Sequence, residues 1–439
     1  MNRSYTLAAI LAASAAVPAI AAVELALPAE GETVQLLPAR QKEVMALATP
    51  VERSDALHAD RIAKKSKNAP KVWRVSEPLM LKWRATDGEK GPWLVRIAKT
   101  AEAVEDVSAP CALELCLDGG SNKGSVNARS EKADDGTYTI SYSVEGANLE
   151  VGERYFWKVW SGVKCPHFEC PPATSDGKCE CGTTGRSSVS AVGSFMTDPS
   201  APRWISVEGR VKNFRDIGGW PTEFGRRVRQ GRVYRGQGLN DNSFYGRKPG
   251  RNRLTVADLA YLKGELGIKT DLDLRWDRET ANMKASPLGE GVKFVNHQSG
   301  SYKAIFADGE KGKKTMAENF RLFTDEANYP IYFHCIGGAD RTGSLAYVLN
   351  GISGVSKHDL EVDWESTFYP DVHGAKDEGK AAKDKDWRGS HWFDEGFAKY
   401  GTADSSLRER IELYLIDCGV TREEIEKVRE LMLEPAQKD

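Results

Sequence analysis

The chain of 439 residues lacks an excess of charge of either sign, and it has no long run of lysine and arginine. Its 61 basic and 63 acidic residues leave a formal net charge of −2. Proteins that bind nucleic acid usually carry a basic patch or stripe, so we expect no nucleic-acid partner. The length allows two or three domains, and one of them can be a complete enzyme core.

Long apolar runs are also missing after residue 22. The first 22 residues combine one arginine with an uncharged run of alanine, leucine and isoleucine, and they end close to Ala19-Ile20-Ala21. This pattern is typical of a cleaved export signal, and the run is short for a bilayer span of about 20 residues. We expect a signal peptide at 1–22 and a periplasmic or extracellular protein with no stable membrane span after cleavage. An uncleaved anchor is the alternative.

Cysteine pairs at the Cys-x-x-Cys spacing of zinc fingers are absent. Six of the eight cysteines lie in the first half of the chain, which leaves Cys335 and Cys418 in the second. In an exported protein such a cluster predicts up to three disulfides, among fifteen possible pairings. A zinc site is the alternative, which the spacing disfavours. We expect a structural role for all six: Cys111, Cys116, Cys165, Cys170, Cys179 and Cys181.

Within residues 23–200, several short runs alternate apolar and polar residues. They include LMLKWRA, PWLVRIAKT, GTYTISYSV and RYFWKVW, and turns rich in Gly, Asn and Asp separate them. This alternation predicts an all-β domain, an antiparallel sandwich. The aromatic placement in LEVGERYFWKVW resembles the last strands of a fibronectin type III-like domain. Partner binding and self-association are both open as the role of this domain.

From residue 201 to 439 the pattern changes. Strand-like stretches such as GIKTDLDLRW, GVKFVNHQ and YPIYFHC alternate with helical ones such as TVADLAYLKGEL, TMAENFRLFTDEA and GSLAYVLNGIS. This alternation predicts an α/β fold, with a mainly parallel sheet flanked by helices. We therefore expect two domains after the signal peptide, with a boundary between residues 200 and 201.

The stretch PIYFHCIGGADRTGSLAYV, from Pro330 to Val348, predicts a buried strand, a glycine-rich turn and the start of a helix. In such a turn the backbone N–H groups converge on one point, and the helix N-terminus adds positive potential. Arg341 can offer a planar fork of donors to a dianion. We predict a phosphate-binding turn formed by Ile336, Gly337, Gly338, Ala339, Asp340 and Arg341.

Cys335 stands at the base of this turn. An ordinary cysteine has a pKa of about 8.5, so only a small fraction is thiolate at neutral pH. The field that binds a phosphate also favours the thiolate, and the same turn can therefore activate a nucleophile. We predict Cys335 as that nucleophile, with the hydroxyl of Thr342 or Ser344 supporting the thiolate.

The motif HCIGGADRTGS, which begins at His334, resembles the HCxxGxxR[ST] signature of the cysteine-dependent protein tyrosine phosphatase superfamily. The stretches NFRDIGG at 213–219 and GRVYRGQGLND, together with DLR at 273–275, resemble the bacterial tyrosine and lipid phosphatase branch. The resemblance covers most of residues 204–439. It implies a cysteinyl-phosphate on Cys335, with Arg341 balancing the charge and with no metal ion or other cofactor.

The resemblance also implies an acid that protonates the leaving oxygen. In the bacterial branch the aspartate at the position of Asp340 is taken as a catalytic partner of the cysteine and the arginine, so we favour Asp340 as the acid. Asp308, in the loop after the strand VKFV, is the alternative, and a role in bracing the loop is the other interpretation of Asp340. We expect Arg215 and Asp216 of NFRDIGG to form a salt-linked turn, and Arg275 to brace the loop.

The branch often carries a lysine immediately before Asp-Arg, where this chain has Ala339. A less charged pocket floor favours phosphotyrosine over polyphosphorylated inositols. We expect a protein tyrosine phosphatase acting on a phosphorylated protein or a small phosphomonoester, with a phosphoinositide or inositol polyphosphate phosphatase as the alternative. A module that binds a phosphate group without turnover is a further class. A rhodanese-like sulfurtransferase is disfavoured by Arg341-Thr342 and by NFRDIGG.

Overall fold

The computed structural model divides the chain into two compact units. Unit 1 comprises Met1–Glu30, Leu81–Tyr142 and Phe156–Ser194, and unit 2 comprises Gly31–Met80, Ser143–Tyr155 and Phe195–Asp439. The structure describes residues 23–64, 75–86, 93–106, 109–117, 128–161, 189–208, 211–240, 253–280, 282–300, 305–306, 309–370 and 391–436. Within these ranges, no helix has both the length and the apolar composition of a membrane span. The export signal at 1–22 lies outside them and stays a prediction.

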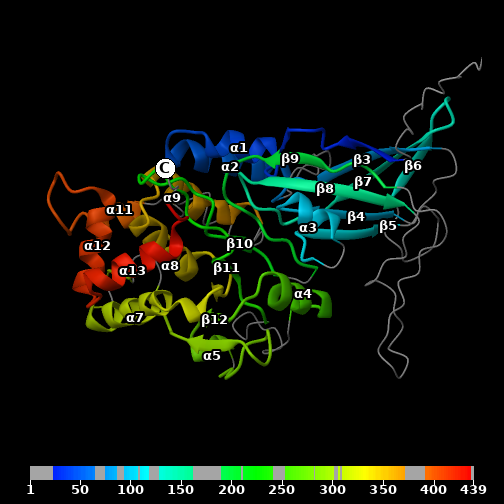
Figure 1. Cartoon of the computed structure of the whole chain (residues 1–439). Helices are drawn as coiled ribbons and strands as arrows, with labels where there is room; N and C mark the ends of the chain where they lie inside the picture. Colours follow the sequence, from blue (N-terminus) through cyan, green and yellow to red (C-terminus); the bar gives the residue numbers. More distant parts are fainter. Residues whose placement is uncertain are drawn as a thin grey trace, which may run out of the picture. The chain divides into compact units, whose positions relative to one another are not determined.

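The strands of the first half of the chain form two sheets (Figure 1). The first has the order β1 (Val23–Leu27), β3 (Leu79–Ala85), β7 (Tyr138–Val144), β6 (Arg129–Lys132). The second has the order β2 (Glu32–Val34), β9 (Gly193–Thr197), β8 (Arg154–Ser161), β4 (Trp93–Ala98), β5 (Leu113–Leu117). Strand β4 pairs antiparallel with β5 and β8, whereas β2 and β9 are parallel. A short helix, α3 (Ala101–Glu105), follows β4.

The core of unit 1 is aromatic. The predicted strands LMLKWRA and RYFWKVW are β3 and β8, and both bury alternate residues because successive side chains in a strand point to opposite faces. Trp83, Trp93 and Trp157 are fully buried, and the rings of Trp83 and Trp93 meet edge to face at 5.7 Å. The all-β sandwich and its fibronectin type III-like assignment stay predictions, as does its role.

The predicted disulfides fall largely outside the described residues. Cys165, Cys170, Cys179 and Cys181 lie in the undescribed range 162–188, and the side chain of Cys116 is not described either. The pairing and the alternative zinc site therefore stay predictions. Among the described residues, no group of three or more His, Cys, Asp or Glu side chains is placed to hold a metal ion.

Unit 2 contains the five-stranded sheet that carries the predicted turn. Its order is β10 (Arg215–Asp216), β11 (Val233–Gln237), β14 (Ile331–Cys335), β12 (Thr270–Asp273), β13 (Lys293–Asn296). Strands β11, β14, β12 and β13 are parallel, and β10 is antiparallel to β11. The expected mixture of α and β structure is confirmed.

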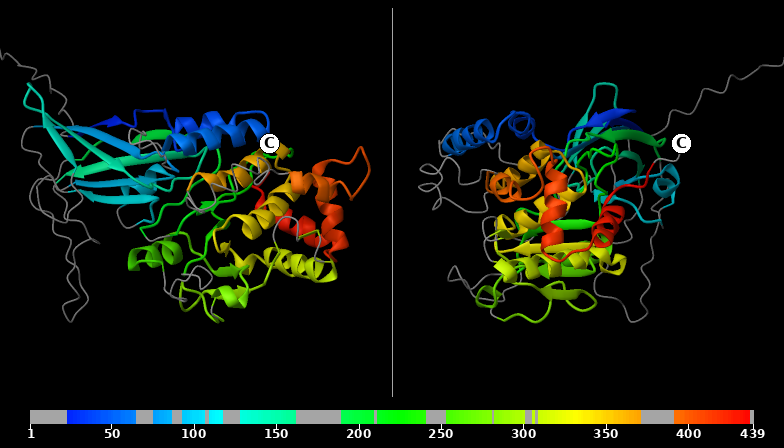
Figure 2. Two further views of the ribbon diagram at one scale, coloured as in Figure 1. Left: turned by 180° about the vertical axis from the view of Figure 1, so that it is seen from behind. Right: turned by 90° about the vertical axis from the view of Figure 1, so that its left-hand side faces the viewer.

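Helices of unit 2 cover both faces of this sheet (Figure 2). Alternation along β14 places Ile331, Phe333 and Cys335 in the larger core, together with residues of α7 (Gly309–Arg321) and α8 (Asp340–Ile352). Tyr332 faces the opposite core, beside the segment of α4 (Val256–Ala260) and a π-helical turn at Tyr261–Glu265. The described part of unit 2 also contains α5 (Asp277–Thr280), α9 (Lys357–Glu365), α11 (His391–Phe397), α12 (Leu407–Asp417) and α13 (Arg422–Met432).

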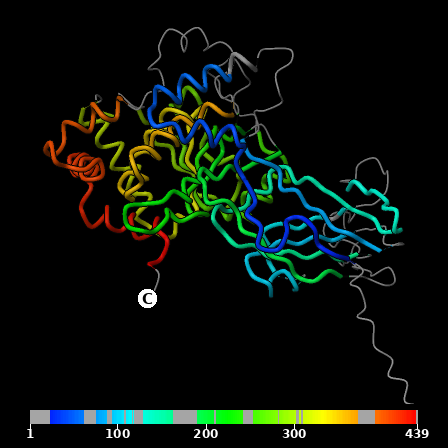
Figure 3. The backbone as a smooth tube through the Cα atoms, turned by 90° about the horizontal axis from the view of Figure 1, so that it is seen from above, coloured from blue at the N-terminus to red at the C-terminus, as the bar shows by residue number. Residues whose placement is uncertain are grey.

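Two helices from the start of the chain also belong to unit 2. These are α1 (Ala39–Met45) and α2 (Pro50–Lys64), which lie alongside α9 (Figure 3). Arg53 of α2 is 1% exposed, and its guanidinium contacts Glu365 at 2.5 Å and Glu361 at 2.8 Å, both on α9. A buried arginine needs such partners, because burial disfavours an unpaired charge. These contacts join α2 to α9 within the unit that carries the parallel sheet. The domain boundary between residues 200 and 201 stays a prediction.

Candidate active site

The predicted turn joins the end of β14 to the start of α8. Cys335 is the last residue of β14, residues 336–339 form the bend, and Asp340 is the first residue of α8. Gly338 has φ +69°, and a Cβ there would overlap the backbone of Gly236 on β11. Only glycine satisfies both conditions without strain. The sequence motif therefore folds as predicted, with Cys335 at the base of the turn and Arg341 in the first turn of the helix.

The thiol of Cys335 is buried, with 3% of the residue exposed. Burial alone raises the pKa of a thiol, but the charge of Arg341 and hydrogen bonds from the hydroxyl and N–H of Thr342 outweigh it. The pKa of Cys335 consequently lies below its ordinary value, although the nearby Asp340 opposes the shift. The buried Thr342 hydroxyl has no other hydrogen-bond partner among the described residues. The site can hold a thiolate.

Arg341 is fixed by a residue that we did not identify from the sequence. Its Nη1 lies 2.7 Å from Oε2 of Glu279 and its Nη2 lies 3.2 Å from Oε1, which is a two-point contact. Nη1 also donates to the carbonyl of Leu274 at 3.2 Å. Glu279 is itself held, because it is buried and accepts the N–H of Trp276 at 2.8 Å. The Glu279 carboxylate orients the guanidinium of Arg341. The only feature of the sequence that could have identified Glu279 is its position four residues after DLR.

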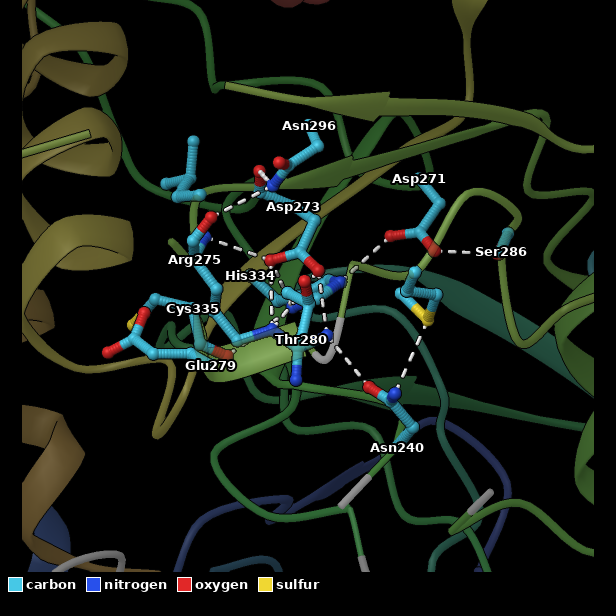
Figure 4. Close-up of polar contacts among 12 residues, drawn as sticks. Asn240, Asp271, Asp273, Arg275, Glu279, Thr280, Ser286, Asn296, His334 and Cys335 are labelled. Atoms are coloured by element: carbon cyan, nitrogen blue, oxygen red, sulfur yellow. Dashed lines mark hydrogen bonds and ion pairs between the residues drawn. The ribbon is translucent and has the colours of Figure 1, made fainter. Parts of the chain in front are cut away.

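A second group of charged side chains lies at the ends of β12 and β14, near Cys335 (Figure 4). Arg275 is buried, contacts Oδ2 of Asp273 at 2.7 Å and donates to Oδ1 of Asn240 at 2.7 Å. His334 Nε2 lies 2.9 Å from Oδ1 of Asp271. Burial lowers the pKa of His334, but Asp273 and Asp271 outweigh it, so the net shift is upward. Arg275 thus supports the carboxyl end of β12, next to the turn.

The other predicted site residues are placed as follows. Asp340 is half-buried at the start of α8, and the hydroxyl of Ser344 donates to its carbonyl at 2.9 Å. Asp308 lies outside the described residues, so its candidacy as an acid stays a prediction. A shallow pocket beside the turn is lined by Leu274, Ser299, Asn319, Arg341, Ser344 and Leu345, among others. It lies next to the guanidinium that is expected to bind the phosphate.

The expected salt link between Arg215 and Asp216 is wrong. The two are neighbours on strand β10, so their side chains point to opposite faces of the sheet. Arg215 pairs with Asp363 of α9 at 2.8 Å, whereas Asp216 pairs with Arg203 at 3.1 Å.

Replacing Thr342 by valine should raise the pKa of Cys335. The wild-type pKa is lowered partly by this hydroxyl, so its loss favours the thiol, and thiolate then forms only at higher pH. We expect a clear upward movement of the midpoint, since a hydrogen bond to a charged group is worth about 1.5–3 kcal/mol. The rate of iodoacetamide alkylation of the Cys335 peptide, followed by mass spectrometry across pH, gives the midpoint.

Two comparisons accompany that measurement. Ser344→Ala should shift the midpoint less, because its hydroxyl donates to the Asp340 carbonyl. Cys418, whose pKa burial raises to about 11, should react only at high pH and serves as an internal reference. An unchanged midpoint in Thr342→Val would contradict the assignment of this hydroxyl to the thiolate.

Replacing Glu279 should weaken the binding of inorganic phosphate in the order wild type, Glu279→Gln, Glu279→Leu. Gln keeps one acceptor for Arg341, whereas Leu removes both, and we expect a loss of roughly tenfold, or about 1.4 kcal/mol, for Leu. Calorimetry measures the affinity. Asp277→Asn is the matched control, because this exposed carboxylate on the same helix accepts from Gln298. The reverse order would show that removal of the negative charge outweighs the loss of alignment.

Comparison with known proteins agrees with this geometry. A family model described as the tyrosine phosphatase family matches residues 205–434. A Cupriavidus necator protein named "Putative tyrosine-protein phosphatase" is 28% identical over 192 residues, which cover 37% of this chain and 65% of that relative. The chain thus spans less than two thirds of that relative's length.

The solved core catalytic domain of the PP-IP phosphatase SIW14 from S. cerevisiae, in complex with citrate, is 14% identical. That match covers 36% of this chain and 88% of the other, and its TM-score of 0.21 is too low to support a conclusion. Because the family model covers just over half of its length, this chain belongs to the tyrosine phosphatase family.

Proposed function

We propose that the protein is a protein tyrosine phosphatase that works through a cysteinyl-phosphate on Cys335. In the first step the Cys335 thiolate attacks phosphorus, the bond from phosphorus to the leaving oxygen breaks, and Asp340 gives that oxygen a proton. In the second step water attacks phosphorus, the sulfur–phosphorus bond breaks, and the thiolate returns while Asp340 takes up a proton. Arg341 and the N–H groups of the turn offset the charge on the transferred group.

One observation carries this proposal: the buried Cys335 has a lowered pKa, and Arg341 is the strongest charge that lowers it. The relation is mutual, because the thiolate also raises the pKa of Arg341, against the effect of burial. A nucleophile and a dianion-binding fork therefore share one small site. Asp340 is half-buried and its charge acts on Cys335, which supports its proposed role as the acid.

Two features favour an aryl phosphate such as phosphotyrosine. Ala339 is buried and uncharged where relatives often carry a lysine, which leaves the pocket floor with less positive charge. Trp276 is 38% exposed, and its ring centre lies 5.2 Å from the guanidinium carbon of Arg341 and 4.5 Å from that of Arg278. An exposed indole beside the phosphate-binding arginine offers a surface for an aromatic ring, and Arg278 adds a cation suited to an acidic peptide.

Hydrolysis of para-nitrophenyl phosphate in EDTA tests the reaction. We expect turnover by the wild-type protein and a loss to background for Cys335→Ser, because serine is a far weaker nucleophile at its ordinary pKa. Cys418→Ser is the control, since it removes the other buried thiol of unit 2 that the structure describes. Activity that needs a metal ion, or that survives in Cys335→Ser, would overturn the mechanism. Comparing a phosphotyrosine peptide, a phosphoinositide and inositol hexakisphosphate identifies the substrate class.

The choice of acid is tested with leaving groups of different basicity. Loss of an acid slows poor leaving groups most, because a good leaving oxygen departs without a proton. We expect Asp340→Asn to reduce phenyl phosphate hydrolysis far more than para-nitrophenyl phosphate hydrolysis, and Asp308→Asn to reduce both little. The opposite assignment would follow if Asp308→Asn alone gave the leaving-group dependence.

A further inference from the structure

The carbonyl groups of the phosphate-binding turn are held from outside the turn. The amide Nδ2 of Asn213 donates to the carbonyl of Gly337 at 3.1 Å and to that of Gly338 at 2.9 Å. The guanidinium Nη2 of Arg235 donates to the same Gly338 carbonyl at 2.9 Å. All four residues are buried, so these hydrogen bonds are shielded from bulk solvent. Two peptide groups of the turn are therefore fixed in orientation.

This orientation decides where the N–H groups point. A trans peptide is planar, and its N–H is directed opposite to its C=O. Because the carbonyls of Gly337 and Gly338 face Asn213 and Arg235, the N–H groups of Gly338 and Ala339 are directed away from them. Those N–H groups are available to a bound oxyanion, as the predicted cradle requires.

Asn213 and Arg235 are in turn aligned by two other residues. Asp363 of α9 contacts Nη1 of Arg235 at 2.6 Å through one oxygen, and Nε of Arg215 at 2.8 Å through the other. Arg215 also donates to the Asp363 carbonyl at 2.8 Å and to Oδ1 of Asn213. The Asn213 carboxamide oxygen is thereby occupied, which leaves its Nδ2 facing the turn. One carboxylate thus orients both arginines.

The charges of this group also affect the thiol. Two buried guanidinium groups share one carboxylate, which leaves a surplus of positive charge. Burial and the neighbouring Arg215 lower the pKa of Arg235 to about 9, and the charges of Asp363 and Cys335 oppose that shift. The charge of Cys335 is thus one of the influences on Arg235 of strand β11, whereas Arg341 of α8 is the main charge that lowers the pKa of Cys335.

We propose that Asn213, Arg215, Arg235 and Asp363 form a loop clamp that holds the turn 336–339 in its anion-binding conformation, with Asn213 and Arg235 as its contacts to the turn. These are positioning residues, because they act through the carbonyls of the turn. The inference rests on the proposed function, since it takes the turn as an oxyanion cradle. It assigns a task to NFRDIGG, GRVYRGQ and HDLEVDW, which lie far apart in the sequence.

The test compares Arg235→Met with Arg203→Met. Arg203 is a buried arginine of the same unit that pairs with Asp216 at 3.1 Å and donates to the carbonyl of Asn148, so its loss measures the effect of breaking any buried ion pair. Calorimetry with inorganic phosphate and the pH midpoint of Cys335 alkylation are the readouts. We expect Arg235→Met to weaken phosphate binding at least tenfold, about 1.4 kcal/mol, and to move the midpoint to higher pH. Arg203→Met should change neither.

A second variant covers the case in which Arg235→Met does not fold. Asn213 has φ +57°, so Asn213→Gly removes the side chain without straining the backbone. Its matched control is Asn148→Gly, since Asn148 has φ +55° and also holds a carbonyl, that of Ser206, at 3.0 Å. We expect Asn213→Gly to weaken phosphate binding with little change in the alkylation midpoint, because it removes no charge.

Equal phosphate affinities for Asn213→Gly and Asn148→Gly, or equal affinities and midpoints for Arg235→Met and Arg203→Met, would overturn the clamp. Neither readout needs turnover. A protein that binds phosphate but hydrolyses nothing would sink the proposed function, while the clamp variants would still report on the turn.

Discussion

A buried thiolate is stable only where positive charge and hydrogen-bond donors surround it, and the site of this protein is built around that requirement. Cys335 is almost completely buried, which by itself would hold its thiol in the neutral form. Arg341 and Thr342 reverse this effect because α8 begins directly after the turn and places both within reach. The short spacing between the cysteine and the arginine therefore allows one turn to activate the nucleophile and to bind the anion.

The guanidinium and the turn need support of their own. Glu279 fixes Arg341 from α5, and Arg275 with Asp273 supports the end of β12 behind the turn. Buried ion pairs contribute little net stability, because desolvation of the charges offsets much of their attraction. We infer that these pairs serve mainly to fix geometry. A planar fork of donors recognises an oxyanion only when it is held in the correct plane.

The same reasoning applies to the segments far from the turn. Asp363 on α9 orients two arginines from β10 and β11, and α9 is itself contacted by Arg53 of α2. Helix α2, the edge strand β10 and its neighbour β11 are thus joined through buried carboxylates of α9. The core on which they rest is continuous, since α8 packs against β14 and α12 packs against α8.

The sequence alone determined those strands, turns and helices that are specified by a few neighbouring residues. The strand, turn and helix around Cys335 follow from apolar alternation, a required glycine and a helix start, all within a few residues. The sequence also supplied the residue types of the site, because thiolate and phosphate chemistry need a cysteine and an arginine at that spacing. Only the tertiary structure decided the partners. Arg215 binds Asp363 and not Asp216, and Glu279 binds Arg341, because packing of distant elements in three dimensions brings these charges together. The spacing of residues along the chain does not predict such long-range ion pairs. Each buried charge pairs with the opposite charge that the fold places beside it.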